Sequence, residues 1–112
     1  MSYEDVKAKL YHGHRVVANN TNLVQYVGNG VAPRIDMYLY NNKVAEFTPT
    51  SVKLFSAGWY TTTTRSRLNL ALILAFIPAE VYQRNHAWYV VGKDWESTFK
   101  DGMELGYDSR LA

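Results

Sequence analysis

The stretch "GWYTTTTRSRLNLALILAF", residues 58 to 76, places four consecutive threonines and two arginines directly before a long apolar segment. From Leu68 to Phe76, apolar residues recur three and four positions apart and also fill most of the positions between. This pattern predicts a helix over about residues 66–77 that is apolar nearly all round, and such a helix is buried on several sides. We expect it to pack on a sheet or against a second copy of the chain, and we expect Pro78 to end it.

The threonine run has two main interpretations. In the structural one, Thr64 caps the helix by accepting a backbone N–H bond, and the other three threonines finish a strand that includes "GWY". In the functional one, hydroxyl and guanidinium groups beside the free N–H groups of a helix start form a phosphate site, made of Thr61, Thr62, Thr63, Thr64, Arg65 and Arg67. A third alternative pairs the two arginines with carboxylates of a partner protein. The sequence leaves open whether the threonines lie in the core or on the surface.

Before this stretch, residues 34–47, "RIDMYLYNNKVAEF", predict a hairpin that turns at Asn41-Asn42. Its period-two pattern sends the apolar side chains Ile35, Met37 and Leu39 into the core. The opposite face receives Tyr38 and Tyr40, and because tyrosine gives rigid contact area at small entropy cost, both are candidate interface residues. Asp36 and Glu46 face each other across this hairpin, and we interpret them as exposed, solubilising acids.

The remaining segments are short. Residues 3–11 predict a weak helix with Ser2 as its N-cap. Strands are expected on both sides of an Asn/Thr turn near residue 20. A loop is expected to open at "GNG", residues 28–30, and to include Pro33, and a further strand is expected at "SVKLFS". A second hairpin, "VYQRNHAWYVV", turns at Asn85-His86.

The C-terminal segment, residues 94–105, fits two structures. The spacing of Trp95, Phe99 and Met103 fits a helix, whereas Asp101-Gly102 is a strong hairpin signal, and we prefer the hairpin. Together the segments predict a single α+β domain over residues 1–112. It contains a strongly twisted antiparallel sheet of five or six short strands, one buried helix and a short N-terminal helix.

Composition excludes several function classes. The chain has 112 residues and no cysteine, which excludes a disulfide scaffold, thiol catalysis and a cysteine-based zinc site. Its net charge of +2 is too small to identify a nucleic-acid binder, although residues 1–92 carry nine basic against five acidic residues. The charged N-terminus and the short apolar run at residues 70–79 predict a cytoplasmic protein that does not contact a membrane. Aromatic content is high, at 14%.

Motifs of catalysis are not found in the sequence. There is no Gly-x-Ser-x-Gly elbow, no Walker-type loop, no His-Glu-x-x-His helix and no Rossmann glycine set. His12 and His14 would share a face if both lay on one strand, but no third metal ligand is near them in sequence, and His86 falls on a turn. We therefore predict a protein that is not an enzyme and has no metal and no cofactor.

Four segments, "VVANNTNL", "GWYTTTTRSRLN", "VYQRNHAWYVV" and "TFKDGMEL", resemble a group of small proteins encoded by tailed bacteriophages. The resemblance spans about residues 15 to 105 and includes a Gly-Trp-x-Thr-x-Thr-Thr-x-x-Arg-x-Asn block. By position it falls on Asn19, Asn20, Thr21, Gly58, Trp59, Thr61, Thr63, Thr64, Arg67, Asn69, Tyr82, Gln83, Trp88, Phe99, Asp101 and Gly102. Two departures are Ala57, where the relatives tend to have glycine, and a longer apolar stretch after Asn69, which would bring a new interface.

The resemblance implies a phage setting rather than a reaction. We therefore predict an accessory protein that acts by binding in the host cytoplasm, as a small homo-oligomer, on a host protein that belongs to a host process or host defence. The alternative is a nucleic-acid or nucleotide binder that uses the Thr/Arg segment 61–67 on phosphate.

Overall fold

The computed structural model describes residues 3–28 and 30–108, and this part of the chain forms nine strands and two helices. The α+β class is therefore confirmed. In chain order the elements are α1 (Tyr3–Lys7), β1 (His14–Ala18), β2 (Thr21–Gly28), β3 (Val31–Leu39), β4 (Asn42–Phe47), β5 (Ser51–Leu54), α2 (Thr62–Leu74), β6 (Glu80–Arg84), β7 (Ala87–Val91), β8 (Glu96–Thr98) and β9 (Met103–Gly106).

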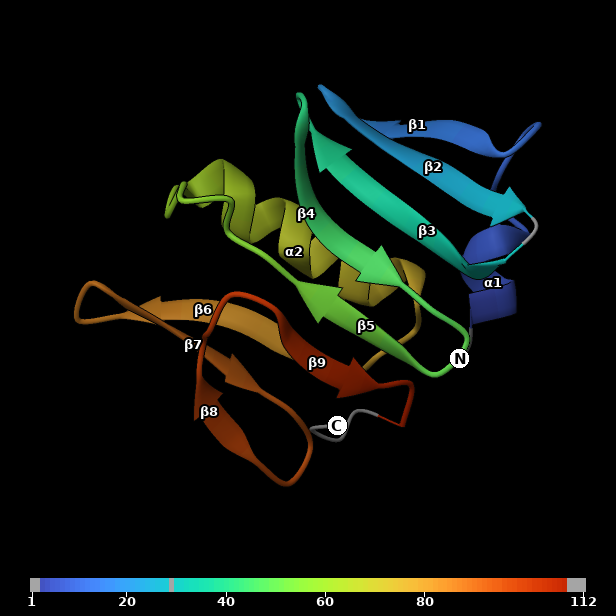
Figure 1. Ribbon diagram of the computed structural model, residues 1–112. Coiled ribbons are helices and arrows are strands. Elements are labelled where there is room, and N and C mark those ends of the chain that lie inside the picture. The colour runs from blue at the N-terminus through green and yellow to red at the C-terminus, as the bar shows by residue number, and fades with distance from the viewer. Residues whose placement is uncertain (1–2, 29, 109–112) are drawn as a thin grey trace.

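The strands form two antiparallel sheets (Figure 1). The large sheet has the order β1-β2-β3-β4-β5-β9, and the small sheet has the order β6-β7-β8. The six-stranded sheet agrees with the predicted strand number, but the second sheet was not predicted. Along the chain, α2 lies between the first five strands and β6, β7 and β8, which pair with one another. The last strand, β9, then pairs with β5 of the large sheet.

Asp101 and Gly102 fix the segment through which the chain passes from β8 back to the large sheet. The Asp101 carboxylate accepts hydrogen bonds from the backbone N–H of Ser56, at 2.6 Å, and from its hydroxyl, at 3.1 Å. The N–H of Gly102 donates to the carbonyl of Leu54 at 2.7 Å, and its φ of +80° favours glycine. The preferred extended structure is thus confirmed for the C-terminal segment, but β8 and β9 belong to different sheets and do not form the predicted hairpin.

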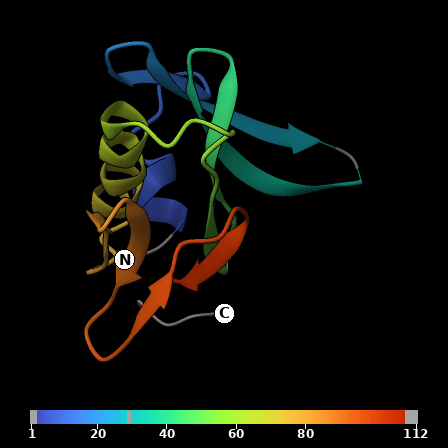
Figure 2. The ribbon, with the colours of Figure 1, turned by 90° about the vertical axis from the view of Figure 1, so that its left-hand side faces the viewer.

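The core lies between α2 and one face of the large sheet (Figure 2). Ile35, Met37 and Leu39 are buried there, as their period-two spacing predicts, and α2 contributes Leu68 and Leu72. In the described part of the chain, no helix covers the opposite face of the sheet, which faces the viewer in Figure 1.

Helix α2 begins earlier than predicted. Thr61 is extended, with φ −108° and ψ 163°, and its hydroxyl accepts the N–H of Thr64 at 3.2 Å, so Thr61 rather than Thr64 is the N-cap. Residues 61–63 therefore do not finish a strand, because the cap lets α2 start within the threonines. The helix ends at Leu74, before Pro78.

The expectation that this helix is buried on several sides is only partly correct. Ala71 and Leu72 are buried, but Ile73 is 67% exposed and Phe76, just past the end of the helix, is 54% exposed. One side of α2 therefore presents apolar side chains to solvent.

Two polar side chains attach α2 to both sheets. The Asn69 amide nitrogen donates to the carbonyl of Val81 at 2.9 Å, and its oxygen accepts the Val81 N–H at 2.7 Å. Arg67 Nε donates to the hydroxyl of Thr21 at 2.7 Å. Because successive helical residues turn by about 100°, residues 67 and 69 point to nearly opposite sides. Arg67 thus holds the β1–β2 turn, and Asn69 holds the edge of β6.

Several boundaries differ from the predicted ones. The first hairpin turns at Tyr40 and Asn41, because Leu39 pairs with Asn42 and Tyr40 adopts φ +57°. Pro33 lies within β3 rather than in a loop. The N-terminal helix α1 covers only Tyr3–Lys7, and its proposed cap, Ser2, lies outside the described residues. The β1–β2 turn and the turn at Asn85-His86 are confirmed.

Replacing Asn69 by alanine tests its role as a link between α2 and the small sheet. The change leaves the N–H and carbonyl of Val81 without their side-chain partner, at a residue that is 1% exposed. We expect Asn69→Ala to lower the free energy of unfolding by ~1–3 kcal/mol in urea titration. As a control, Asn42→Ala at an exposed position should change it by less than ~0.5 kcal/mol. Equal losses in the two variants would contradict this role.

Candidate functional site

A cleft of about 360 Å³ lies between the β3–β4 turn, the loop before α2 and the first turn of α2. We call it the aromatic cleft. Its lining is mostly apolar, with a few hydroxyl and amide groups, and consists of Leu39, Tyr40, Asn42, Val44, Ser56, Ala57, Trp59, Thr61, Thr63 and Thr64. This volume lies within the range of small-molecule binding pockets.

Large aromatic side chains stand exposed at this cleft. Tyr40 is 64% exposed and Trp59 is 60% exposed. The next residue, Tyr60, is 58% exposed and contacts Trp88 edge-on, with ring centroids 4.9 Å apart. Single exposed aromatic side chains are ordinary, but several of them grouped at one cleft are frequent in binding surfaces.

The loop that carries Trp59 is tightly held. Ala57 and Gly58 both adopt positive φ, at +56° and +80°, which bends the chain before the tryptophan. The Ser56 hydroxyl accepts the N–H of Gly58 at 3.1 Å, and Trp59 N–H donates to the Ser56 carbonyl at 3.0 Å. Ser56 is in turn bound by Asp101, which lies where the chain passes from β8 of the small sheet to β9 of the large sheet. These contacts together fix the backbone position of Trp59.

The structure divides the predicted phosphate-site residues between two hollows. Thr61 and Thr63 are exposed and line the aromatic cleft with the buried Thr64. Thr62, Arg65 and Arg67 line a different hollow beside β1. The threonine run therefore lies partly on the surface, with Thr61 and Thr63, and partly in the core, with Thr64. The four threonines and the two arginines do not form one site.

The two predicted interface tyrosines have different surroundings. Both line a shallow hollow with Asn22 and Asn41, but only Tyr40 also reaches the aromatic cleft. The Tyr38 hydroxyl lies 2.8 Å from the Tyr26 hydroxyl and donates to Asp36 at 3.3 Å. The hydrogen bond with Tyr26, burial and the negative charge of Asp36 all raise the pKa of Tyr38. The Tyr38 hydroxyl is therefore bonded within the chain, whereas the exposed Tyr40 ring can contact a partner.

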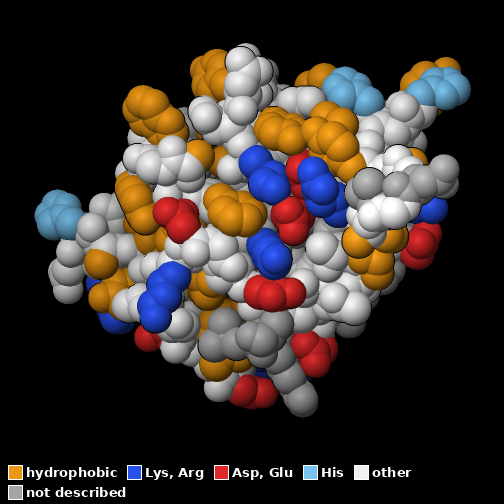
Figure 3. All heavy atoms as spheres, in the orientation of Figure 1, with side chains coloured by type: hydrophobic (Ala, Val, Ile, Leu, Met, Phe, Trp, Pro, Cys, Tyr) orange, Lys and Arg blue, Asp and Glu red, His pale blue; other side chains and the backbone are white. Residues whose placement is uncertain are grey.

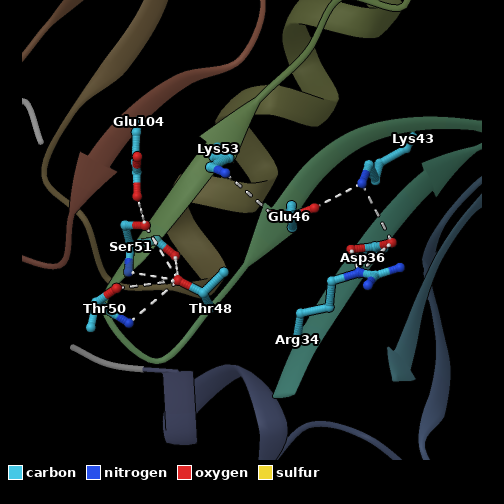
Figure 4. Close-up of polar contacts among 9 residues, drawn as sticks. All are labelled: Arg34, Asp36, Lys43, Glu46, Thr48, Thr50, Ser51, Lys53 and Glu104. Carbon is cyan, nitrogen blue, oxygen red and sulfur yellow. Dashed lines mark hydrogen bonds and ion pairs between the residues drawn. The ribbon is translucent and has the colours of Figure 1, made fainter. Parts of the chain in front are cut away.

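That network lies on the open face of the large sheet, where Figure 3 shows basic and acidic side chains intermingled. Asp36 is only 1% exposed, so the prediction of an exposed acid is wrong for this residue. Arg34 Nε lies 3.2 Å from Asp36 Oδ1, and Lys43 Nζ lies 3.8 Å from Asp36 Oδ2 (Figure 4). Because β3 pairs with β4, Asp36 is opposite Glu46, and Lys43 pairs with both acids.

The network continues to β5, where Lys53 Nζ lies 3.8 Å from Glu46 (Figure 4). A separate contact joins β5 to β9, where Glu104 accepts a hydrogen bond from the Ser51 hydroxyl (Figure 4). Arg34 also stacks over Tyr26, 4.5 Å from the ring centroid. Sequence reasoning missed this cluster because its basic residues come from three strands whose register was not known. Each acid already has basic or hydroxyl partners, so the cluster stabilises the sheet.

The two histidines considered for a metal site do not share one strand. His14 lies on β1, while His12 precedes it in a turn with φ +53°. Within residues 3–28 and 30–108, no group of three His, Asp or Glu side chains is arranged to hold a metal ion. In the same part of the chain, no helix is long and apolar enough to span a membrane.

Comparison with protein families identifies the family of this chain. The protein-family model described as "Kyanoviridae Gp96 protein" matches residues 2–106, which include both sheets, α2 and the aromatic cleft. The chain belongs to the Kyanoviridae Gp96 protein family. It is a family of phage proteins, so the predicted phage origin is confirmed. Searches of curated proteins and of solved structures found no match for this Kyanoviridae Gp96 family member.

The charged network predicts how stability depends on pH. Burial disfavours ionised Glu46, but the Lys43 hydrogen bond and the charges of Lys43, Lys53 and Arg34 outweigh it and lower the pKa of Glu46. A lowered pKa stabilises the folded state above the unfolded pKa of about 4.3, and this contribution is lost as the pH falls through the folded pKa. Glu46→Gln should therefore reduce the free energy of unfolding by ~1 kcal/mol at pH 7 and by less at pH 3.

Urea unfolding of the wild type and the variant at both pH values measures this effect. The matched control is Glu80→Gln, which changes an exposed acid on β6 and should alter stability little at either pH. A Glu46→Gln effect that stays constant from pH 7 to pH 3 would contradict the assignment.

Proposed function

We propose that this phage protein acts by binding, without catalysing a reaction, and that its aromatic cleft receives an apolar side chain of a partner protein. The observation that carries this proposal is the exposure of Tyr40 and Trp59 around a cavity of about 360 Å³. The proposed partner is a host protein that belongs to a host process or host defence, met in the cytoplasm of the infected cell.

The chemistry of the lining supports a side-chain ligand. Leu39 and Val44 are buried and give the cleft an apolar base, Trp59 stands exposed beside them, and Thr61 and Thr63 add hydroxyl groups to the lining. Tryptophan and tyrosine contribute strongly to binding energy when a partner removes them from water. An aromatic or branched aliphatic side chain of the partner fits this combination.

The rigidity of the cleft also supports binding. The Asp101–Ser56 contacts fix the loop before Trp59, and the Thr61 cap fixes the first turn of α2. A preformed site loses little conformational entropy when a ligand enters, so more of the contact energy appears as affinity. Phosphate binding by the Thr/Arg segment receives less support, because the cleft threonines and the arginines line different hollows.

Self-association is a second use of the same surface. Tyr40 protrudes at the tip of a hairpin, and an exposed aromatic at such a position contributes to small homo-oligomer interfaces. Tyr40→Ser tests this use better than a change of Tyr38, which would also disturb the Asp36 network. If the wild type forms an oligomer in analytical ultracentrifugation, Tyr40→Ser should shift it toward the monomer mass. An unchanged oligomer mass would contradict self-association through Tyr40.

Removal of the tryptophan tests the binding function itself. We expect Trp59→Ser to abolish capture of a partner from host lysate and to weaken its affinity by more than about tenfold once the partner is purified. Because Trp59 is 60% exposed, this variant should keep the fold, which circular dichroism and urea titration check. Capture by affinity pull-down with mass spectrometry and affinity by calorimetry are the measurements.

The matched control is Tyr11→Ser, which removes an aromatic side chain that is 77% exposed and lies outside the cleft. This control should capture the same partner as the wild type. A partner that is lost equally from both variants, or retained by Trp59→Ser, would refute binding through the cleft.

A further inference from the structure

A second hollow, of about 520 Å³, lies between α2 and the edge strand β1. We call it the basic groove. Its lining consists of Val17, Ala18, Thr62, Arg65, Ser66, Arg67, Asn69, Leu70 and Ile73. The groove and the aromatic cleft share no residue, so an inference about the groove is independent of the function proposed for the cleft.

The positive charge of the groove is not neutralised within the described residues. Arg65 donates to the Gln83 amide oxygen at 2.7 Å, and Arg67 donates to the Thr21 hydroxyl at 2.7 Å, so both guanidinium groups bond to uncharged acceptors. The ion pairs found in this part of the chain lie on the opposite face of the large sheet, around Asp36 and Glu46. Among the described residues, none that lines the groove is acidic.

The groove also has an exposed apolar side. Leu70 and Ile73, three positions apart, lie on one face of α2, and Phe76 follows just past the end of the helix. Ile73 is 67% exposed and Phe76 is 54% exposed. Between Leu70 and Ile73 the helix rises by about 4.5 Å, which is nearly one turn, and Phe76 lies beyond the last helical residue, Leu74.

A second basic pair lies at the far end of this apolar line. Lys9 Nζ lies 5.6 Å from the centroid of the Phe76 ring, and Arg15 donates to the Lys9 carbonyl at 3.1 Å. Cations therefore lie near both ends of the apolar line, with Arg65 and Arg67 beside the start of α2 and Lys9 and Arg15 beside its end.

We infer that the basic groove binds an acidic, amphipathic segment of a partner protein. The apolar side chains of the segment pack on Leu70, Ile73 and Phe76, and its carboxylates pair with Arg65 at one end and Lys9 at the other. Arginine pairs well with carboxylates because its planar donor groups match their geometry. The exposed apolar side of α2 supplies contact area, and the charges orient the ligand and speed its approach.

Other occupants fit the groove less well. A second copy seated groove to groove would bring the cations at the ends of one groove close to the cations of the other, which is repulsive. Single-stranded nucleic acid gains affinity by stacking successive bases on aromatic side chains, and the line of Leu70, Ile73 and Phe76 offers one ring for this, that of Phe76. An acidic peptide satisfies both the charge and the aliphatic surface.

Selection from a displayed library of random peptides, each about 12 residues long, tests this inference. Wild-type protein serves as bait, and the double variant Arg65→Gln/Ile73→Ser removes peptides that bind elsewhere. We expect the enriched peptides to be net negative and to carry aliphatic residues three and four positions apart. Fluorescence anisotropy with labelled copies of these peptides should show affinity falling by about tenfold for Ile73→Ser and for Arg65→Gln.

The matched control is Arg84→Gln, which removes an arginine on β6 that does not line the groove. It should leave the affinity within about twofold of wild type, and raising the salt from 50 to 300 mM should weaken wild-type binding several-fold. Urea titration checks that each variant is folded, and Arg65→Gln alone serves if Ile73→Ser is not. Enrichment of neutral or basic peptides, an equal loss in Arg84→Gln, or tighter binding of a twelve-residue thymidine oligonucleotide would overturn the inference.

Discussion

The double hydrogen bond between Asn69 and Val81 is the contact on which the arrangement of this protein depends. Helix α2 packs its buried side on the large sheet. Asn69 attaches the small sheet to the same helix, because its amide supplies both a donor and an acceptor to the backbone of β6, at distances of 2.9 and 2.7 Å. Two positions earlier, Arg67 reaches the opposite side and holds the β1–β2 turn. One helix thus connects two sheets, because residues two apart on a helix point to nearly opposite sides. The amide of Asn69 also occupies the edge of β6, where an unpaired strand would otherwise offer its hydrogen-bonding groups to another chain.

Both proposed binding surfaces depend on where this helix lies. The aromatic cleft forms where the capped start of α2 meets the Trp59 loop, and the basic groove forms where its solvent side meets β1. The two surfaces differ in chemistry, since one offers aromatic rings and hydroxyl groups and the other offers aliphatic side chains and uncompensated arginines. On the open face of the large sheet, Asp36 and Glu46 neutralise the cations, and the Tyr38 hydroxyl is already bonded to Tyr26 and Asp36.

Local patterns in the sequence were enough to predict much of the fold. Period two correctly placed Ile35, Met37 and Leu39 in the core, and the turn at Asn85-His86 followed from residues that tolerate positive φ. The start of α2 was predicted too late because a threonine run favours strands, whereas one hydroxyl, that of Thr61, caps the helix. The buried state of Asp36 was missed because Lys43 and Arg34 approach it only once strand register is fixed. The phosphate-site hypothesis joined residues that are adjacent in sequence, but a helix directs successive side chains to different sides, and so it separated Thr63 from Arg65.

Native-state hydrogen exchange, followed residue by residue by NMR, tests most directly whether α2 joins the two sheets into one unit. If it does, the Val81 amide opens only when α2 leaves the sheets, so its opening free energy will equal that of the amides in α2 and at the centre of the large sheet. A Val81 amide that exchanges at a much lower opening free energy than those of α2 would contradict the account. It would mean that the small sheet detaches while the helix stays in place.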